Sequence, residues 1–554
     1  MTIIFCGILR IFYRGNKIET RIEQKNRITS HLNKPVTNYI IIAGLIFIVG
    51  LLLYNQKNNS VPATINSGND YSIAVMPFVD LSSEKNQEYF ADDISEEVLN
   101  MLASIDQLNV TSRTTAFSLR GQQLSIPEIA ERLNINYIVE GSVRRSNDRI
   151  RITAQLIDTR NDRQLWSENY DRELTNIFSI QDDISQQIVT ALELELIGNN
   201  RISNVPTRNM DAYTLYLQGH QLFLNRGIGD LNANINNIER AISYLEQAVE
   251  IDPNFAEAWA DLATSLIILP SYFDKKYSFD KVSPTATDSA NKAISLKPTL
   301  SQAWAVKGFI HLNKLEFQEP EAAILHATEL NSNNETAWFW RGLHYLAVGN
   351  HDRAIDAIEN AISISPNVPI YHSGLGLARH SLKDIDQAII HMDKAIDEMG
   401  FEAGRLDRAL VAMWNNNTNR ARKEMIKFSS IYDQSASEEL IQKINTYIDA
   451  YSMQSSNYQA RQLLLNDIEE QRENTFGLYM IQDSELFIAD FAKTPVNKGF
   501  VLSRIYNPIA RSFFKEKSYR EFIKNIGLFT YWKNNSFPVF CYEIDDNDFA
   551  CGEP

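Results

Sequence analysis

Residues 241–263 read AISYLEQAVEIDPNFAEAWADLA, two helical patterns joined at Pro253. The same arrangement returns every 34 residues along the chain, since Trp304 and Trp338 are 34 positions apart. Three further sets keep this step: Gly308, Gly342 and Gly376; Ala327, Ala361 and Ala395; Ile324, Ile358 and Met392. Helix ends recur at Pro253, Pro298 and Pro366, with Ser332 where one proline is missing. Such a period predicts stacked helix–turn–helix units that bury one continuous core.

This pattern resembles the tetratricopeptide repeat. The resemblance predicts an all-α solenoid over residues 210–430, with five clear repeats and a degenerate sixth near residues 403–430. Two stretches are longer than the pattern allows. The second, residues 268–284, is either an interaction loop or an ordinary packed loop.

The resemblance also implies which residues line the inner face of the solenoid. We expect a partner-binding groove at Phe309, Leu312, Asn313, Phe339, Leu343, Leu346, Leu377 and His380. The set contains no Lys or Arg, so an apolar extended or helical segment of a protein or peptide fits it better than a terminal carboxylate. The alternative is that Phe309, Phe339 and the leucines simply pack against neighbouring helices.

Residues 71–200 predict a small α/β domain. Ser72–Phe78 is a short apolar run typical of a buried strand, and residues 137–144 and 149–158 predict a hairpin. An apolar stripe from Ile94 to Ile105 predicts a helix between them. A cluster of acids lies at the expected start of that helix, where capping explains it without catalysis: Asp92, Asp93, Glu96 and Glu97.

Two strings in this region closely resemble the TolB-like N-terminal domain, which precedes tetratricopeptide repeats in many bacterial membrane proteins. They are SIAVMPFVDLSSEKNQEYFADDISEEV at residues 72–98 and YIVEGSVRRSNDRIRITAQLIDTRNDRQLWSENYDREL at residues 137–174. Relatives such as CadC-like membrane-bound transcriptional regulators and repeat-containing adenylate cyclases carry a cytoplasmic output domain before the membrane span. Residues 1–38 are too few for such an output domain, so we expect this chain to depart from the family there. Within the second string, Arg144 and Arg145 either contact a ligand carboxylate or phosphate, or pair with acids on the wet face of the sheet.

A membrane anchor is predicted at residues 36–54, nineteen positions without a charge, about the length that crosses a bilayer. Seven basic residues precede it: Arg10, Arg14, Lys17, Arg21, Lys25, Arg27 and Lys34. Because basic flanks stay in the cytoplasm, residues 1–35 form a cytoplasmic leader. Residues 55–70 form a linker, and the rest lies in the periplasm of a bacterial inner-membrane protein. A cleaved signal peptide or a buried core helix is the alternative.

The net charge of −16 comes from 53 Lys and Arg against 69 Asp and Glu. The first 57 residues carry +6, so the remaining residues carry −22, which argues against nucleic acid as their partner. Residues 431–554 predict further helices and a tail in which Cys541 and Cys551 form a disulfide or remain free thiols.

The sequence contains no phosphate-binding loop, no HExxH and no GxSxG motif, so we expect no enzyme activity, no cofactor and no metal. His344 and His351 are expected to be exposed or packed histidines. We therefore predict a membrane-anchored α+α/β protein that binds a protein or peptide partner, as an envelope sensor or assembly scaffold in signal transduction. The alternative is a signalling receptor, a transcriptional regulator or adenylate cyclase, whose output domain is lost or missing from the gene model. The oligomeric state is left open.

Overall fold

The computed structural model describes residues 71–552, with gaps at 83–87, 104, 106–107, 123, 147–148, 174–179, 181–182, 185–186, 189, 192–206, 225–230, 273–276, 433–437, 454–457, 470–482 and 494–496. The predicted leader, membrane span and linker lie outside these residues. Within the described ranges, no helix has the length and apolar character needed to cross a membrane.

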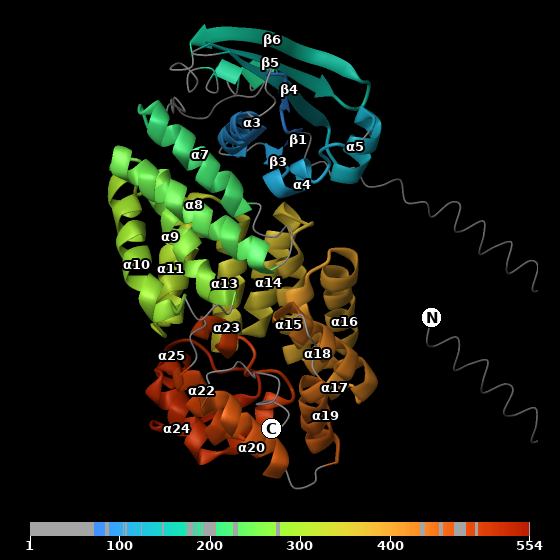
Figure 1. Ribbon diagram of the computed structural model, residues 1–554, viewed down its shortest axis with the longest axis vertical. Helices are drawn as coiled ribbons and strands as arrows, with labels where there is room; N and C mark the ends of the chain where they lie inside the picture. Colours follow the sequence, from blue (N-terminus) through green and yellow to red (C-terminus); the bar gives the residue numbers. More distant parts are fainter. Residues whose placement is uncertain are drawn as a thin grey trace, which may run out of the picture. The chain divides into compact units, whose positions relative to one another are not determined.

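A small sheet begins the described part of the chain (Figure 1). Its strand order is β3 (Asn109–Val110), β1 (Ser72–Val75), β4 (Tyr137–Ser146), β5 (Arg149–Asp158) and β6 (Arg163–Glu173), and β2 (Val79–Asp80) also pairs with β4. The strands β4, β5 and β6 are antiparallel, whereas β1 runs parallel to both of its neighbours. Ser146 pairs with Arg149, so the predicted hairpin is confirmed.

Three helices cover the parallel end of this sheet: α3 (Glu88–Ala103), α4 (Arg113–Phe117) and α5 (Ile126–Leu133). Ile73 and Val75 of β1 join the core that contains α3, while Ala74 of the same strand joins Ile129 of α5. Burial on both faces explains why β1 is apolar throughout, as parallel strands usually are. The capping box between Ser125 and Glu128 starts α5.

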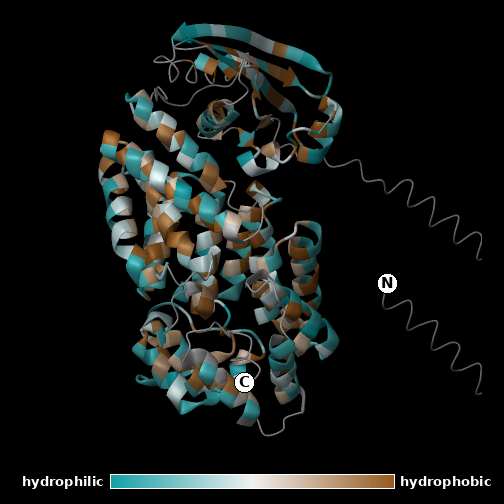
Figure 2. Ribbon diagram, viewed as in Figure 1, coloured by the Kyte–Doolittle hydropathy of each residue, from teal (hydrophilic) through white to brown (hydrophobic). Residues whose placement is uncertain are grey.

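The helical region begins with six antiparallel helix pairs in its described part. The pairs are α7 (Met210–Leu224) with α8 (Leu231–Ile251), α9 (Ala256–Ile268) with α10 (Phe279–Leu296), α11 (Ser301–Asn313) with α12 (Gln318–Leu330), α13 (Glu335–Val348) with α14 (His351–Ile364), α15 (Pro369–Ser381) with α16 (Ile385–Asp393), and α17 (Arg405–Trp414) with α18 (Thr418–Tyr432). Both hydrophilic and hydrophobic residues occur along these helices (Figure 2). A mostly helical solenoid with a small sheet domain is therefore confirmed.

Close packing inside each pair explains the 34-residue step. A Cβ atom on Gly342 of α13 would lie 2.4 Å from Cγ1 of Ile358 on α14. Gly308 faces Ile324 at 2.3 Å in the same way, and Gly376 faces the side chain of Met392 at 2.7 Å. Only glycine lets the two helices of a pair approach so closely, and the large partner fills the space.

A second contact also repeats with the units. The indole nitrogens of Trp259, Trp304 and Trp338 donate hydrogen bonds to the carbonyl six residues earlier, at 2.8–3.0 Å. In the next unit Nε2 of His372 lies 2.9 Å from the carbonyl of Pro366. These bonds satisfy a carbonyl at the turn between units, a group that a helix end otherwise leaves unpaired.

The insert at residues 268–284 is packed where it is described. It contains a short 3₁₀ helix, η4 (Leu269–Tyr272), and the first turns of α10, in which Phe279 is buried. Tyr277 donates a hydrogen bond to Glu239 of α8. Of the two interpretations, the described residues fit the ordinary packed loop.

The remaining described elements complete the chain. Two short elements, η5 (Lys394–Glu398) and η6 (Glu402–Gly404), lie between α16 and α17. The elements after α18 are α19 (Glu438–Met453), α20 (Tyr458–Glu469), α22 (Ser484–Lys493), α23 (Lys498–Leu502), η7 (Ala510–Lys515), α24 (Lys517–Asn525), α25 (Leu528–Asn534), β7 (Cys541–Asp545) and β8 (Asp548–Cys551). Cys541 and Cys551 face each other across β7 and β8 and are joined by a disulfide. Side chains of this region share one hydrophobic core with α9 to α15, α17 and α18.

Candidate functional site

The residues predicted to line the groove come from α11, α13 and α15, and they share one property, which is burial. At most 4 % of any of these side chains is exposed: Phe309, Leu312, Asn313, Phe339, Leu343, Leu346, Leu377 and His380. No open groove therefore exists at these positions. The segment that covers part of them belongs to the same chain.

The short helix α23 lies on this face. The backbone N–H of Gly499 donates a hydrogen bond of 2.9 Å to Oδ1 of Asn313, whose Nδ2 donates to the carbonyl of Phe309. A Cβ atom on Gly499 would meet Leu312 at 3.0 Å. The ring of Phe500 meets that of Phe309 edge to face, with centroids 6.0 Å apart. A peptide segment thus occupies the predicted groove through one backbone-directed hydrogen bond and apolar contacts.

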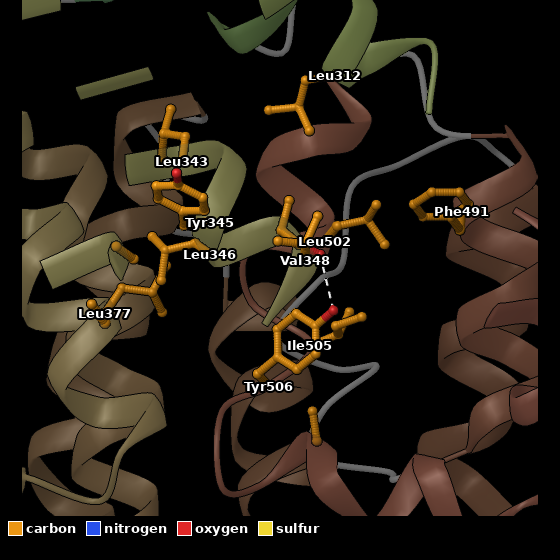
Figure 3. Close-up of a cluster of buried hydrophobic side chains, with 14 of the residues drawn as sticks. Leu312, Leu343, Tyr345, Leu346, Val348, Leu377, Phe491, Leu502, Ile505 and Tyr506 are labelled. Carbon is orange, nitrogen blue, oxygen red and sulfur yellow. Dashed lines mark hydrogen bonds between the residues drawn. The ribbon is translucent and has the colours of Figure 1, made fainter. Parts of the chain in front are cut away.

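The segment after α23 continues along the repeats. Arg504 pairs with both carboxylate oxygens of Asp407 on α17, at 2.7 and 3.0 Å, and Asp407 is buried. The hydroxyl of Tyr506 donates to the carbonyl of Ala347 at 2.9 Å. Figure 3 shows this bond, with Leu502, Ile505 and Tyr506 facing the end of α13. We call residues 497–506 the docked segment.

The alternative that these side chains pack within the protein is therefore what the structure shows. Sequence reasoning missed the docked segment, because α23 is five residues long and has no repeating pattern. The available signal was Gly499 next to the apolar residues 500–502, which a single sequence does not distinguish from an ordinary loop.

The acids at residues 92–97 were predicted to cap the start of a helix, and for Asp92 and Asp93 this prediction is wrong. The helix α3 begins at Glu88, so Asp92 and Asp93 lie inside it and are buried, and they do not cap it. Arg120 pairs with Asp92. Asp93 accepts a hydrogen bond from Tyr213 of α7, and its burial raises its pKa well above the usual range.

His220 joins this cluster to the first repeats. Its Nε2 lies 3.0 Å from Oε1 of Glu96 on α3, and its Nδ1 lies 2.5 Å from Oδ2 of Asp261 on α9. Burial disfavours the charged ring, but the two carboxylates outweigh it and raise the pKa of His220 well above its usual value. Burial also opposes ionisation of Glu96, yet His220 and Arg113 lower the pKa of Glu96 to about 2. The charged ring therefore links the sheet domain to the solenoid.

Arg144 and Arg145 are not brought together at a site. Arg144 is exposed on β4 opposite Arg151, and no ion pair to a described residue is seen for it. The guanidinium of Arg145 lies over the ring of Phe90, 5.8 Å from its centroid. The acid pairing expected on the wet face is made by Arg149 and Arg151, both with Asp171.

The two singled-out histidines are packed. Nε2 of His344 lies 3.4 Å from the hydroxyl of Tyr531, and the ring of His351 meets that of Tyr506 edge to face. Burial lowers the pKa of both histidines to about 3. Both rings are therefore neutral at physiological pH.

Comparisons with known proteins agree with the repeat architecture. Residues 227–255 and 335–368 match tetratricopeptide repeat families, and residues 69–188 match the family described as HilA/YgeH-like transcriptional regulator, second domain. The chain thus contains tetratricopeptide repeats, and residues 69–188 are similar to the second domain of that regulator family. The TolB-like resemblance and the membrane anchor stay predictions.

Two relatives match parts of the chain. "Putative adenylate cyclase 3" of Rhizobium meliloti (strain 1021) is 36% identical over 206 residues, 37% of this chain and 34% of that protein. Anaphase-promoting complex subunit 3 of Schizosaccharomyces pombe is 26% identical over 193 residues, 34% of this chain and 27% of that protein. The chain therefore spans about a third or less of the length of the curated relatives it matches.

Two solved structures are also similar to parts of the chain. The crystal structure of MamA has 27% identity, covers 30% of this chain and 92% of that one, and has a TM-score of 0.23. PilW, a type IV pilus biogenesis factor, has 17% identity, covers 42% and 97%, and has a TM-score of 0.32.

Proposed function

We propose that this chain is a non-enzymatic protein of signal transduction that binds a protein or peptide partner through its repeats, as an envelope sensor or an assembly scaffold. The repeat matches support the binding role, and the names of the regulator family and of the Rhizobium relative support signalling. In this proposal residues 36–54 cross the bacterial inner membrane once, with the N-terminus in the cytoplasm. The uncharged run and its basic flank support that placement.

The observation that carries the proposal is the docked segment. It gives a direct example of a peptide held on the inner face, by the amide of Asn313, the rings of Phe309 and Phe500, and the carboxylate of Asp407. A partner segment with the same apolar pattern and one basic residue has the chemistry to replace it. The partner would then bind when residues 497–506 leave the face.

Partner capture from the cell envelope tests this proposal. The variant Arg504→Asp places a second carboxylate beside the buried Asp407 and weakens docking without altering the repeats. The charge-swapped variant Arg504→Asp with Asp407→Arg is the matched control, because it restores opposite charges. We expect full-length Arg504→Asp to capture the same envelope protein as the wild type in larger amount, and the swap to return to the wild-type amount.

The contrary result is equally clear. If folded wild type and folded Arg504→Asp both retain no envelope protein, or retain one in equal amounts, the inner face is not the partner-binding surface.

A second candidate function rests on the name of the matching regulator family and on the name of the Rhizobium relative. A match to a domain of transcriptional regulators and a relative named as an adenylate cyclase favour a receptor whose output domain is encoded next to this sequence. Reading the upstream DNA in frame tests this candidate. A winged-helix or cyclase sequence there supports it, and an unrelated gene removes it.

A further inference from the structure

A cavity remains between the docked segment and the repeats. Its volume is about 140 Å³, and it is bounded by α13, α15, α17, α18 and the docked segment. Aromatic and aliphatic side chains form most of its wall: Phe339, Leu343, Leu377, Phe401, Phe428 and Phe500. An apolar cavity of about 150 Å³ is large enough to hold a benzene-sized molecule.

The charges on this wall cancel. Asp407 and Arg504 both line the cavity, and they form the two-bonded ion pair described above. A charged ligand would have to break that pair or remain without a counter-ion in an apolar space, which is costly. The electrostatics therefore favour an uncharged ligand.

Two polar side chains on the wall have an oxygen without a hydrogen-bond partner among the described residues. One is Oδ1 of Asn497, which is buried, and the other is the hydroxyl of Ser373. Ser373 of α15 is 5 % exposed, and its hydroxyl makes no hydrogen bond to a described residue. A Cβ atom on Gly404 would lie 3.1 Å from Oγ of Ser373, so the hydroxyl lies close to η6, whose Ala403 also lines the cavity. A buried hydroxyl without a hydrogen bond is unfavourable, and a ligand with a donor or acceptor would satisfy it.

We propose that this cavity binds a small uncharged aromatic molecule with one hydroxyl or ring N–H, a phenol or an indole, whose polar group bonds to Ser373. The ring lies among the phenylalanine and leucine side chains, and the polar atom faces α15. This site is additional to the protein-binding role, and it does not depend on that role or on the membrane anchor. Ala403 lines the cavity and is itself exposed, which places it at the mouth.

Calorimetry on the full-length chain tests the site with two probes, 4-methylphenol and toluene, which differ in one hydroxyl. The wild type is expected to bind both, and 4-methylphenol more tightly. Ser373→Ala is expected to weaken the affinity for 4-methylphenol by about 3- to 10-fold, which corresponds to the loss of one hydrogen bond. The affinity for toluene should stay within about twofold of the wild-type value.

Two tryptophan variants complete the design. Ala403→Trp closes the mouth and is expected to abolish binding of both probes. Gln387→Trp on the exposed surface of α16 is the control, since Gln387 does not line the cavity and binding should persist. The proposal is overturned if the wild type binds neither probe, if Ala403→Trp binds both as the wild type does, or if Ser373→Ala affects both probes equally.

Discussion

His380 is fully buried in α15, and neither of its ring nitrogens has a hydrogen-bond partner among the described residues. Burial, helped by the charge of Arg511, lowers its pKa to about 3 from the ordinary value of 6.5. The unfolded chain therefore binds a proton between these two pH values that the folded chain does not. The neutral His380 ring therefore contributes fully to the free energy of unfolding above pH 6.5, and this contribution is lost as the pH falls below 6.5.

The variant His380→Leu tests this linkage. Between pH 7 and pH 5.5 the wild type should lose about 1 kcal/mol of unfolding free energy through His380 alone, and His380→Leu should not. Urea unfolding of both proteins at the two pH values measures the difference. An equal loss in both proteins would show that His380 has the same pKa in the folded and unfolded chains, and would contradict its burial as a neutral ring.

Gly342 tests the packing that produces the repeat. Alanine favours helices over glycine by about 1 kcal/mol, yet its Cβ would lie 2.4 Å from Ile358. We expect Gly342→Ala to destabilise the chain by about 1–3 kcal/mol, and the double variant with Ile358→Ala to cost less than the sum of the single changes. A stabilising Gly342→Ala would contradict the close approach of α13 and α14.

At the scale of elements, the sequence predicted the paired helices but not the docked segment. The period is visible because each glycine and its large partner lie sixteen residues apart within one unit, as Gly342 and Ile358 do. The contact of Asp407 with Arg504 joins positions 97 residues apart and belongs to no period. The local sequence pattern predicted the apolar inner face of the repeats. The docked segment that covers this face is placed by long-range packing, which one sequence does not reveal.

The start of α3 was misplaced for a similar reason. The predicted apolar stripe begins at Ile94, whereas in the structure Phe90, four residues earlier, is buried in the same core. Including Phe90 moves the acids from the cap into the helix interior. Their role as a link to α7 and α9 depends on contacts such as Asp93 with Tyr213, 120 residues away.

The terminal hairpin gives a test of the disulfide. In the register of β7 with β8, Cys541 lies opposite Cys551. Phe549 of β8 is fully buried and its ring contacts that of Trp532. In denaturant without reductant, we expect one reactive thiol per chain, that of Cys6. Three reactive thiols would rule out the bridge. Replacing both bridged cysteines by serine should lower stability by about 2–3 kcal/mol.

At the scale of the whole molecule, the proposed membrane anchor at residues 36–54 predicts that the two ends of the chain lie on opposite sides of the membrane. Alkaline phosphatase, which is active only in the periplasm, should be active when fused after Pro554 and inactive when fused after Ser30. A chain that retains its N-terminal tag in the membrane fraction distinguishes an anchor from a cleaved signal peptide. Phosphatase activity at Ser30 but not at Pro554 would contradict the predicted orientation.

The binding of a peptide to the inner face tests the central claim most directly. The probe is a fluorescent peptide of residues 497–508, NKGFVLSRIYNP, added to the full-length chain. We predict that the wild type, whose face is occupied, binds it at least tenfold more weakly than Arg504→Asp, and that Arg504→Asp with Asp407→Arg loses this gain. A folded Arg504→Asp that binds the peptide no better than the wild type would contradict the account.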